Sequence, residues 1–207
     1  ILNMPDQLLM LDNSKLTPLQ SNSILAMLHK SQIEVYVNSK DKPVEYMFDY
    51  RFEIKVEDLK MFNDMKKTDN LIMDNLHYIK DNVKLLQNLA FQSFDTRSFS
   101  SFTIFPEIIM SEDEFGKMIL KYQLSTSLLK IIYNKKGYID SSGDYCEDKT
   151  LYTPIYLDLL KESGLSKKSE ICLYKMLLCL GVKFNYHPTI SIYYPIEEFK
   201  RIVGLPL

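Results

Sequence analysis

The stretch FTIFPEIIMSEDEFGKMILKYQLS, residues 102–125, decides the fold, because it predicts an antiparallel β-hairpin. Two runs rich in β-branched and other apolar residues flank the polar segment SEDEFGK. Gly116 lies in that segment, as expected of a hairpin turn. The residues that follow, STSLLKIIY, predict a short helix that a serine or threonine can cap.

The residues before the hairpin predict three helices and one strand. Thr17 can cap a first helix, and Pro18 suits its first turn. Aromatic residues at alternate positions over 46–54 are typical of a half-buried strand. A short helix is expected over 56–62 and a long amphipathic helix over 69–91.

The residues after the hairpin predict a linker and a second set of elements. The stretch NKKGYIDSSGDYCEDKT holds glycines, serines and charges with few aliphatic residues, so we expect a domain boundary there. Helices are expected over 151–164 and 165–182. A strand over 189–194 then leads into a helix that begins after Pro195 and ends at Gly204.

The order of these elements predicts the α+β fold class, with tandem winged-helix domains. A strand, a three-helix core and a hairpin wing fill residues 1–145, which we expect to be the first domain. Helix, strand and helix recur in residues 146–207, the linker and second domain. That domain is expected to be truncated at the C-terminus, before its recognition helix and wing.

Composition excludes several classes of protein. Of the 207 residues, 46% are hydrophobic and 25% charged, as in an ordinary globular protein. No apolar run approaches the roughly 20 residues of a membrane span. Three scattered histidines and three cysteines give neither a zinc motif nor a disulfide framework. We therefore expect a cytoplasmic protein with no membrane contact, no metal and no other cofactor.

Charge is unevenly distributed along the chain, although the total is only −2. Residues 166–207 carry six basic and three acidic side chains, a net charge of +3. The helix expected over 69–91 carries three aspartates and two lysines, so phosphates would repel it. The C-terminal part is therefore the part expected to contact DNA.

The sequence also carries no motif for catalysis. The adjacent pair Glu197 and Glu198 would point to different sides of a helix, and the acidic run at 112–114 falls in the hairpin turn. Neither a phosphate-binding glycine loop nor a metal motif is found. We therefore expect a protein that is not an enzyme.

Five stretches resemble the plasmid replication initiator (Rep) proteins of bacteria, which consist of two winged-helix domains in tandem. They are MPDQLLMLDNSKLTPLQSNSILAMLHKS, FEIKVEDLKMF, FTIFPEIIMSEDEFGKMILKYQLSTSLLKII, KKSEICLYKMLL and ISIYYPIEEFKRIVGLP. The likeness follows nearly the whole chain in order and spacing. It departs at Cys172, where members of the family often carry arginine before a Leu-Tyr pair.

The resemblance implies a protein that binds repeated double-stranded DNA sites at a plasmid origin. The second domain would read bases, the first would pair the protein into homodimers, and a host replicative helicase would be a further partner. Contacts with DNA phosphates are expected from Lys167, Lys168, Lys175, Lys200 and Arg201. Dimer contacts are expected from Tyr46, Phe48, Tyr50 and Phe52, or from the hairpin 102–124.

Two other functions fit the same elements. A tandem winged-helix transcription regulator would bind a single palindrome near a promoter. A winged-helix interaction scaffold would make no direct DNA contact. The ordinary interpretation of Lys167 and Lys168 is a solvated helix end, and that of Lys200 is an ion pair with Glu197.

Overall fold

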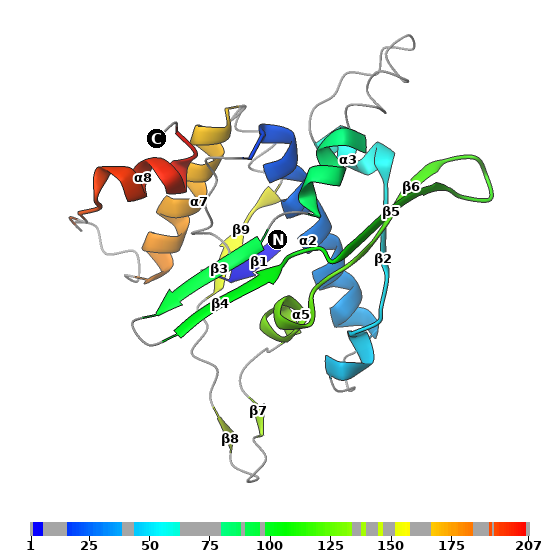
Figure 1. Cartoon of the computed structure of the whole chain (residues 1–207), viewed down its shortest axis with the longest axis horizontal. Coiled ribbons are helices and arrows are strands. Elements are labelled where there is room, and N and C mark those ends of the chain that lie inside the picture. The colour runs from blue at the N-terminus through cyan, green and yellow to red at the C-terminus, as the bar shows by residue number, and fades with distance from the viewer. Residues whose placement is uncertain are drawn as a thin grey trace. The chain divides into compact units, whose positions relative to one another are not determined.

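The computed structural model of the chain describes residues 2–5, 16–38, 44–62, 80–87, 90–95, 98–133, 138–139, 145–146, 152–157, 167–183, 191 and 193–205. The chain divides into two compact units (Figure 1). One is Thr17–Leu129, and the other combines Ile1–Leu16 with Lys130–Leu207. This division falls earlier in the chain than the boundary between 145 and 146 that the sequence suggests.

The first helix of the unit Thr17–Leu129 begins where the sequence predicts. Helix α2 spans Pro18–Asn38. The Thr17 hydroxyl accepts a hydrogen bond from the backbone N–H of Gln20 at 3.2 Å, and the Gln20 side-chain oxygen accepts one from the Thr17 N–H at 2.9 Å. This reciprocal capping box pairs donors that the first turn of a helix otherwise leaves unpaired.

A three-stranded antiparallel sheet packs against α2. Its order is β2 (Phe52–Lys55), β6 (Met118–Gln123) and β5 (Glu107–Glu112). Strands β5 and β6 form the predicted hairpin, and Gly116 takes φ = 73° in its turn. The Asp113 carboxylate accepts hydrogen bonds from the N–H groups of residues 115 and 117 at 2.9 and 2.7 Å, which fixes the turn.

Aromatic side chains join the sheet to α2. Phe52 and Tyr122 stack across β2 and β6 with ring centroids 5.7 Å apart, and Phe105 meets Tyr122 edge-on at 5.8 Å. All three side chains are fully buried. The Tyr122 hydroxyl donates to the backbone carbonyl of Met27 at 2.6 Å, and the Ser31 hydroxyl donates to the same carbonyl at 2.8 Å. The buried hydroxyls therefore have partners, as a stable core requires.

The prediction of a strand over 46–54 is wrong in its first half. Residues Val44–Met47 form a 3₁₀ helix, η1, and the strand begins only at Phe52. Backbone hydrogen bonds from residues 48 and 50 to the carbonyls three positions earlier turn the chain between the two elements. Met47, which the alternation assigned to the polar face, is fully buried as a result.

Three further elements of this unit bear on the sequence predictions. The helix predicted over 56–62 is confirmed as α3 (Val56–Phe62), and the helix after the hairpin as α5 (Thr126–Tyr133). The long helix predicted over 69–91 lies mainly outside the described residues, of which 80–86 are helical. It ends earlier than predicted, because Ala90 begins β3 (Ala90–Asp95), which pairs with β4 (Ser98–Thr103).

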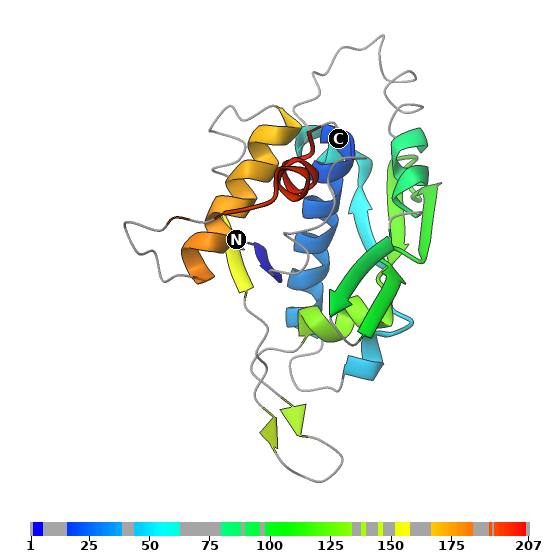
Figure 2. The same cartoon turned by 60° about the vertical axis from the view of Figure 1, so that its left-hand side comes forward.

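In the other unit, two strands far apart in sequence pair with each other. Strand β1 (Leu2–Pro5) lies antiparallel to β9 (Tyr152–Ile155), as Figure 2 shows. The helix predicted over 151–164 is therefore wrong at the residues of β9. Pro154 explains the strand, because proline cannot donate the hydrogen bond of a helix interior and favours an extended residue before it. A shorter pair, β7 (Tyr138–Ile139) and β8 (Tyr145–Cys146), lies in the expected linker.

Among the described residues of this unit that follow residue 157, two helices are found, and both were predicted. They are α7 (Lys168–Lys183) and α8 (Ile196–Val203). Where a strand was predicted over 189–194, the described residues 191, 193 and 194 have no regular structure, and the rest lie outside the described part of the chain. The protein is thus a mixed α+β protein, and the assignment of tandem winged helices stays a prediction.

Candidate nucleic-acid interface

Helices α7 and α8 form the scaffold on which most of the predicted phosphate contacts lie. Met176 of α7 is buried together with Ile202 and Val203 of α8. Three partly buried side chains pack against this cluster: Leu180, Tyr194 and Phe199. Burial of these apolar side chains holds the two helices together, so residues on their outer faces keep fixed relative positions.

Caps at both ends define α8. Pro195 precedes the first turn, which carries Glu197 and Glu198 at the end of the helix dipole that favours acidic residues. Gly204 takes φ = 72°, and its N–H and that of Leu205 donate to the carbonyls of residues 201 and 200 at 3.4 and 2.9 Å. This is a Schellman ending, which needs a residue that tolerates the left-handed conformation.

Lys200 and Arg201 lie in the last turn of α8, where the helix dipole favours basic side chains. Both side chains are half-buried. The Lys200 ammonium lies 3.9 Å from the Glu197 carboxylate, a loose and partly exposed ion pair. Such a pair is weak, so it leaves Lys200 able to exchange the carboxylate for a phosphate.

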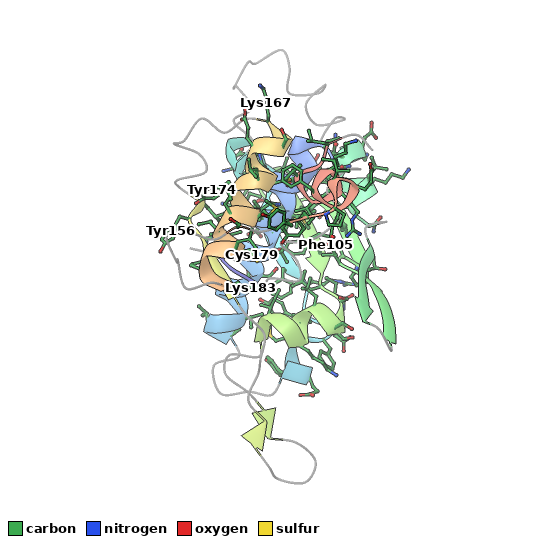
Figure 3. The ribbon with its side chains drawn as sticks, turned by 90° about the vertical axis from the view of Figure 1, so that its left-hand side faces the viewer. Phe105, Tyr156, Lys167, Tyr174, Cys179 and Lys183 are labelled. Atoms are coloured by element: carbon green, nitrogen blue, oxygen red, sulfur yellow. The ribbon has the colours of Figure 1, made fainter. Side chains whose placement is uncertain are left out.

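Lys167 precedes the first turn of α7 and extends away from it (Figure 3). Its side chain is 77% exposed, and its ammonium lies 3.8 Å from the Glu170 carboxylate. The same carboxylate accepts the Lys167 backbone N–H at 3.1 Å. A carboxylate therefore already occupies part of this helix N-terminus, and a phosphate would have to compete with it. Lys168 begins α7, but its side chain lies outside the described part of the structure.

The prediction that Lys175 contacts phosphate is wrong in this structure. Its side chain lies on the inner face of α7 with Ile171, Cys172, Met176 and Cys179, and Lys175 is only 4% exposed. Burial lowers the pKa of Lys175, whereas the neighbouring Cys172 thiol acts in the opposite direction. An ammonium held inside the protein cannot reach a DNA backbone.

Lys183 is a candidate that sequence reasoning passed over. It is exposed in the last turn of α7, at the end of the helix opposite Lys167. The helix between residues 168 and 183 is about 22 Å long at the usual rise per residue. Exposed cations therefore stand at both ends of one helix, too far apart to bind a single small anion but well spaced for an extended polyanion. The helix predicted from the sequence ends at residue 182, one position before Lys183, whereas α7 includes Lys183 in its last turn.

An exposed aromatic residue adjoins α8. Tyr193 is 92% exposed and lies shortly before the helix, and Ile196 in the first turn is also exposed. Its neighbour Tyr194 is half-buried against α7, where burial, with Cys179 and Glu198, raises the pKa of its hydroxyl. An exposed tyrosine can stack on a base or sugar. Tyr193 adjoins the first turn of α8, which carries Glu197 and Glu198, whereas Lys200 and Arg201 lie in the last turn.

The residues predicted for the dimer interface do not share one surface. Tyr46 is exposed, Phe48 and Tyr50 are half-buried, and Phe52 is fully buried in the core. The Tyr50 hydroxyl donates to the Glu34 carboxylate at 3.1 Å and its ring meets Phe52 edge-on at 5.0 Å. Phe52 therefore cannot present its side chain to another molecule, and that part of the prediction is wrong.

Neither a metal site nor a membrane span is found in the part of the chain that the structure describes. Within it, no three side chains of the metal-binding types lie together, and no helix is long and apolar enough to cross a bilayer. Cys172 and Cys179 are both buried, and neither forms a disulfide. Comparison with known protein families, with curated proteins and with solved structures finds no match for this chain.

Proposed function

We propose that this chain belongs to a non-enzymatic replication initiator that binds repeated double-stranded DNA sites at a plasmid origin. The observation that carries the proposal is the arrangement of basic side chains on the α7–α8 scaffold, of which Lys167 and Lys183 are exposed and Lys200 and Arg201 half-buried. Lys167 and Lys183 mark the two ends of one helix, and Lys200 and Arg201 lie on the helix packed against it. This spacing suits the repeated charges of a DNA backbone.

The distribution of charge between the two units supports the same division of labour. Residues 17–129 carry 13 basic and 16 acidic side chains, a net charge of −3. The other unit carries 12 basic and 11 acidic side chains, a net charge of +1. The unit Thr17–Leu129 is therefore the less suited to DNA, and we assign self-association to it. Recruitment of a replicative helicase is part of the same proposal and rests on the resemblance to initiators alone.

Duplex binding measured by fluorescence anisotropy at several salt concentrations tests the proposal. We expect Lys183→Glu to weaken binding and to reduce the dependence of log affinity on log salt by about one contact. Lys84→Glu is the matched control, because Lys84 is an exposed helical lysine of the acidic unit. Equal effects of the two substitutions would contradict the assignment of α7 to DNA.

A map of binding sites across the replicon that encodes the protein separates initiation from regulation. Repeats of about 20 base pairs beside an A·T-rich tract, the spacing of two helical turns, support initiation. A single palindrome near a promoter supports the transcription regulator instead.

A scaffold without DNA contact is the second candidate, and one observation favours it. Leu173 and Leu177, one turn apart on α7, are both exposed, with Leu177 at 57%. An apolar ridge of this kind is typical of a surface that meets another protein. Two results together would support the scaffold function. The chain would bind no duplex at low salt, and Leu177→Lys would remove its binding to another protein of the replicon.

A further inference from the structure

Two of the lysines proposed to contact DNA are paired with carboxylates nearby in the chain. The Lys167 ammonium lies 3.8 Å from the Glu170 carboxylate, and the Lys200 ammonium lies 3.9 Å from the Glu197 carboxylate. The partners of each pair are three residues apart, a spacing that brings side chains together on one face of a helix. Each lysine therefore already has an anion beside it before any DNA arrives.

A carboxylate and a DNA phosphate offer similar groups to a lysine. Both carry negative charge on oxygen atoms, which accept charge-assisted hydrogen bonds from an ammonium. A carboxylate that stays beside the lysine also repels an approaching phosphate, because their charges have the same sign. The two anions therefore compete for each ammonium.

The exposure of the two pairs allows this exchange. One partner of each pair is largely open to water, since the side chain of Lys167 is 77% exposed and that of Glu197 is 67% exposed. At 3.8 and 3.9 Å, neither pair is as close as a hydrogen bond. Exposed pairs of this kind are weak, so the dense row of charges on a DNA backbone can displace the carboxylates.

Glu170 also caps the start of α7. Its carboxylate accepts the backbone N–H of Lys167 at 3.1 Å, at the end of the helix dipole that favours an anion. A phosphate at this end would therefore meet a carboxylate that occupies both the side chain and the backbone donor of Lys167. Glutamine at this position keeps the acceptor for the N–H but carries no charge, so Glu170→Gln separates the two roles.

We propose that Glu170 and Glu197 restrain DNA binding, because each holds a lysine in the free protein and must release it to a phosphate. The inference rests on the proposed function and describes how the same surface is regulated. Contact with DNA breaks two internal ion pairs, which lowers the affinity for every duplex alike. Preference among sequences is unchanged, since phosphate contacts carry no sequence information.

Glu198 provides the comparison that separates this role from general repulsion. It adjoins Glu197 in the first turn of α8 and carries the same charge. Adjacent residues of a helix point in different directions, and the charge of Glu198 acts on the Tyr194 hydroxyl. None of the described lysines forms an ion pair with it. Glu198→Gln therefore removes one negative charge near α8 without releasing a lysine.

A double-mutant cycle on duplex affinity tests the inference, with fluorescence anisotropy of the full chain at low salt as the measurement. We expect Glu197→Gln to raise the affinity about two- to fivefold, the range expected from loss of a weak exposed ion pair. In a Lys200→Met background the same substitution should raise it by less than about twofold, because no lysine is left to release. Glu198→Gln should have the same small effect in both backgrounds.

The second pair is tested by the same cycle with Glu170→Gln and Lys167→Met. The gain from Glu170→Gln should again depend on the presence of the lysine. Because glutamine keeps the cap of α7, the variant should match the parent in circular dichroism, so a change in affinity reports the ion pair and not the helix.

Acylation of the free chain checks the ion pairs without DNA. Glu197→Gln should raise the rate at which Lys200 is acylated, because the carboxylate no longer holds the ammonium in its charged form. Glu198→Gln should leave that rate at the parent value. Mass spectrometry of the modified peptides measures both rates.

Two outcomes would overturn the inference. Gains that persist undiminished in the Lys→Met backgrounds would show general repulsion, and no gain from either glutamine variant would show that the carboxylates do not compete. Either outcome, with a parent that binds duplex, rejects the inference alone. Absence of duplex binding by the parent and by every variant at low salt rejects the proposed function, and the inference with it.

Discussion

Replacing Tyr122 by phenylalanine would remove a single buried hydroxyl from the core of the unit Thr17–Leu129. The ring remains between Phe52 and Phe105, so neither packing nor volume changes. The Met27 carbonyl keeps the Ser31 hydroxyl as a donor at 2.8 Å, so no buried acceptor is left unpaired. The loss is therefore one net hydrogen bond, about 1 kcal/mol of unfolding free energy. Tyr122→Ala, which also removes the ring, is expected to cost about 3–5 kcal/mol.

Urea titration followed by circular dichroism measures both losses. We expect Tyr122→Phe to lower the midpoint without changing the slope, since the surface exposed on unfolding stays the same. A loss as large as that of Tyr122→Ala would contradict the reasoning, because it would mean that the hydroxyl organises the core rather than adding one bond. No loss at all would show that water replaces the hydroxyl in the folded state.

The same hydroxyl gives a dependence on pH with a defined sign. Burial raises the pKa of Tyr122 well above its usual value; the Ser31 hydroxyl, 3.0 Å from the Tyr122 hydroxyl, opposes this shift and the nearby Glu34 adds to it. Above pH about 10 the unfolded chain releases the tyrosine proton and the folded chain keeps it, so stability falls as the pH rises. The fall should be smaller in Tyr122→Phe. Identical pH dependence in parent and variant would refute the assignment.

Two further predictions concern substitutions in the other unit, and a third concerns the whole protein. Lys175→Met should leave duplex affinity unchanged, because Lys175 is buried. Burial lowers the pKa of Lys175 in the folded state, so the parent protein loses stability as the pH falls below about 10.4, the pKa of lysine in the unfolded chain. The variant should lose less stability over the same range, and urea titrations at two pH values check this. Gly204→Ala should lower the free energy of unfolding by about 1 kcal/mol, because φ = 72° is unfavourable for alanine. Gly116→Ala, at φ = 73° in the hairpin turn, is the comparison, and the urea midpoints of the two variants show whether the two sites behave alike. Supercoiled plasmid should remain intact with the purified protein, and a covalent tyrosine–DNA adduct on a denaturing gel would contradict the assignment as a non-enzyme.

Sequence patterns predicted the elements that local interactions specify. The capping box at Thr17, the hairpin turn at Gly116 and the left-handed ending at Gly204 each depend on residues a few positions apart, so their signals are present in short stretches. The pairing of β1 with β9 joins segments some 150 residues apart, and no short pattern encodes it.

The candidate interface was predicted less well, for a physical reason. Alternating aromatics at 46–54 predict a strand, because the pattern does not reveal that residues 44–47 form η1 and that the chain turns after it. The sequence predicts an exposed Lys175, because a lysine on an apolar helix usually reaches solvent at its tip. In the structure α7 packs against both β9 and α8, and Lys175 is buried. Which face of α7 is covered depends on those distant partners.

Lysine protection tests most directly the central claim that α7 and α8 contact DNA. The full chain is acylated with and without duplex DNA from its replicon, and modification of each lysine is quantified by mass spectrometry. The account predicts that DNA protects Lys167, Lys183 and Lys200, that exposed Lys84 and Lys117 of the acidic unit react equally in both samples, and that buried Lys175 reacts in neither. Protection of Lys84 and Lys117 with none at α7 and α8 would contradict it.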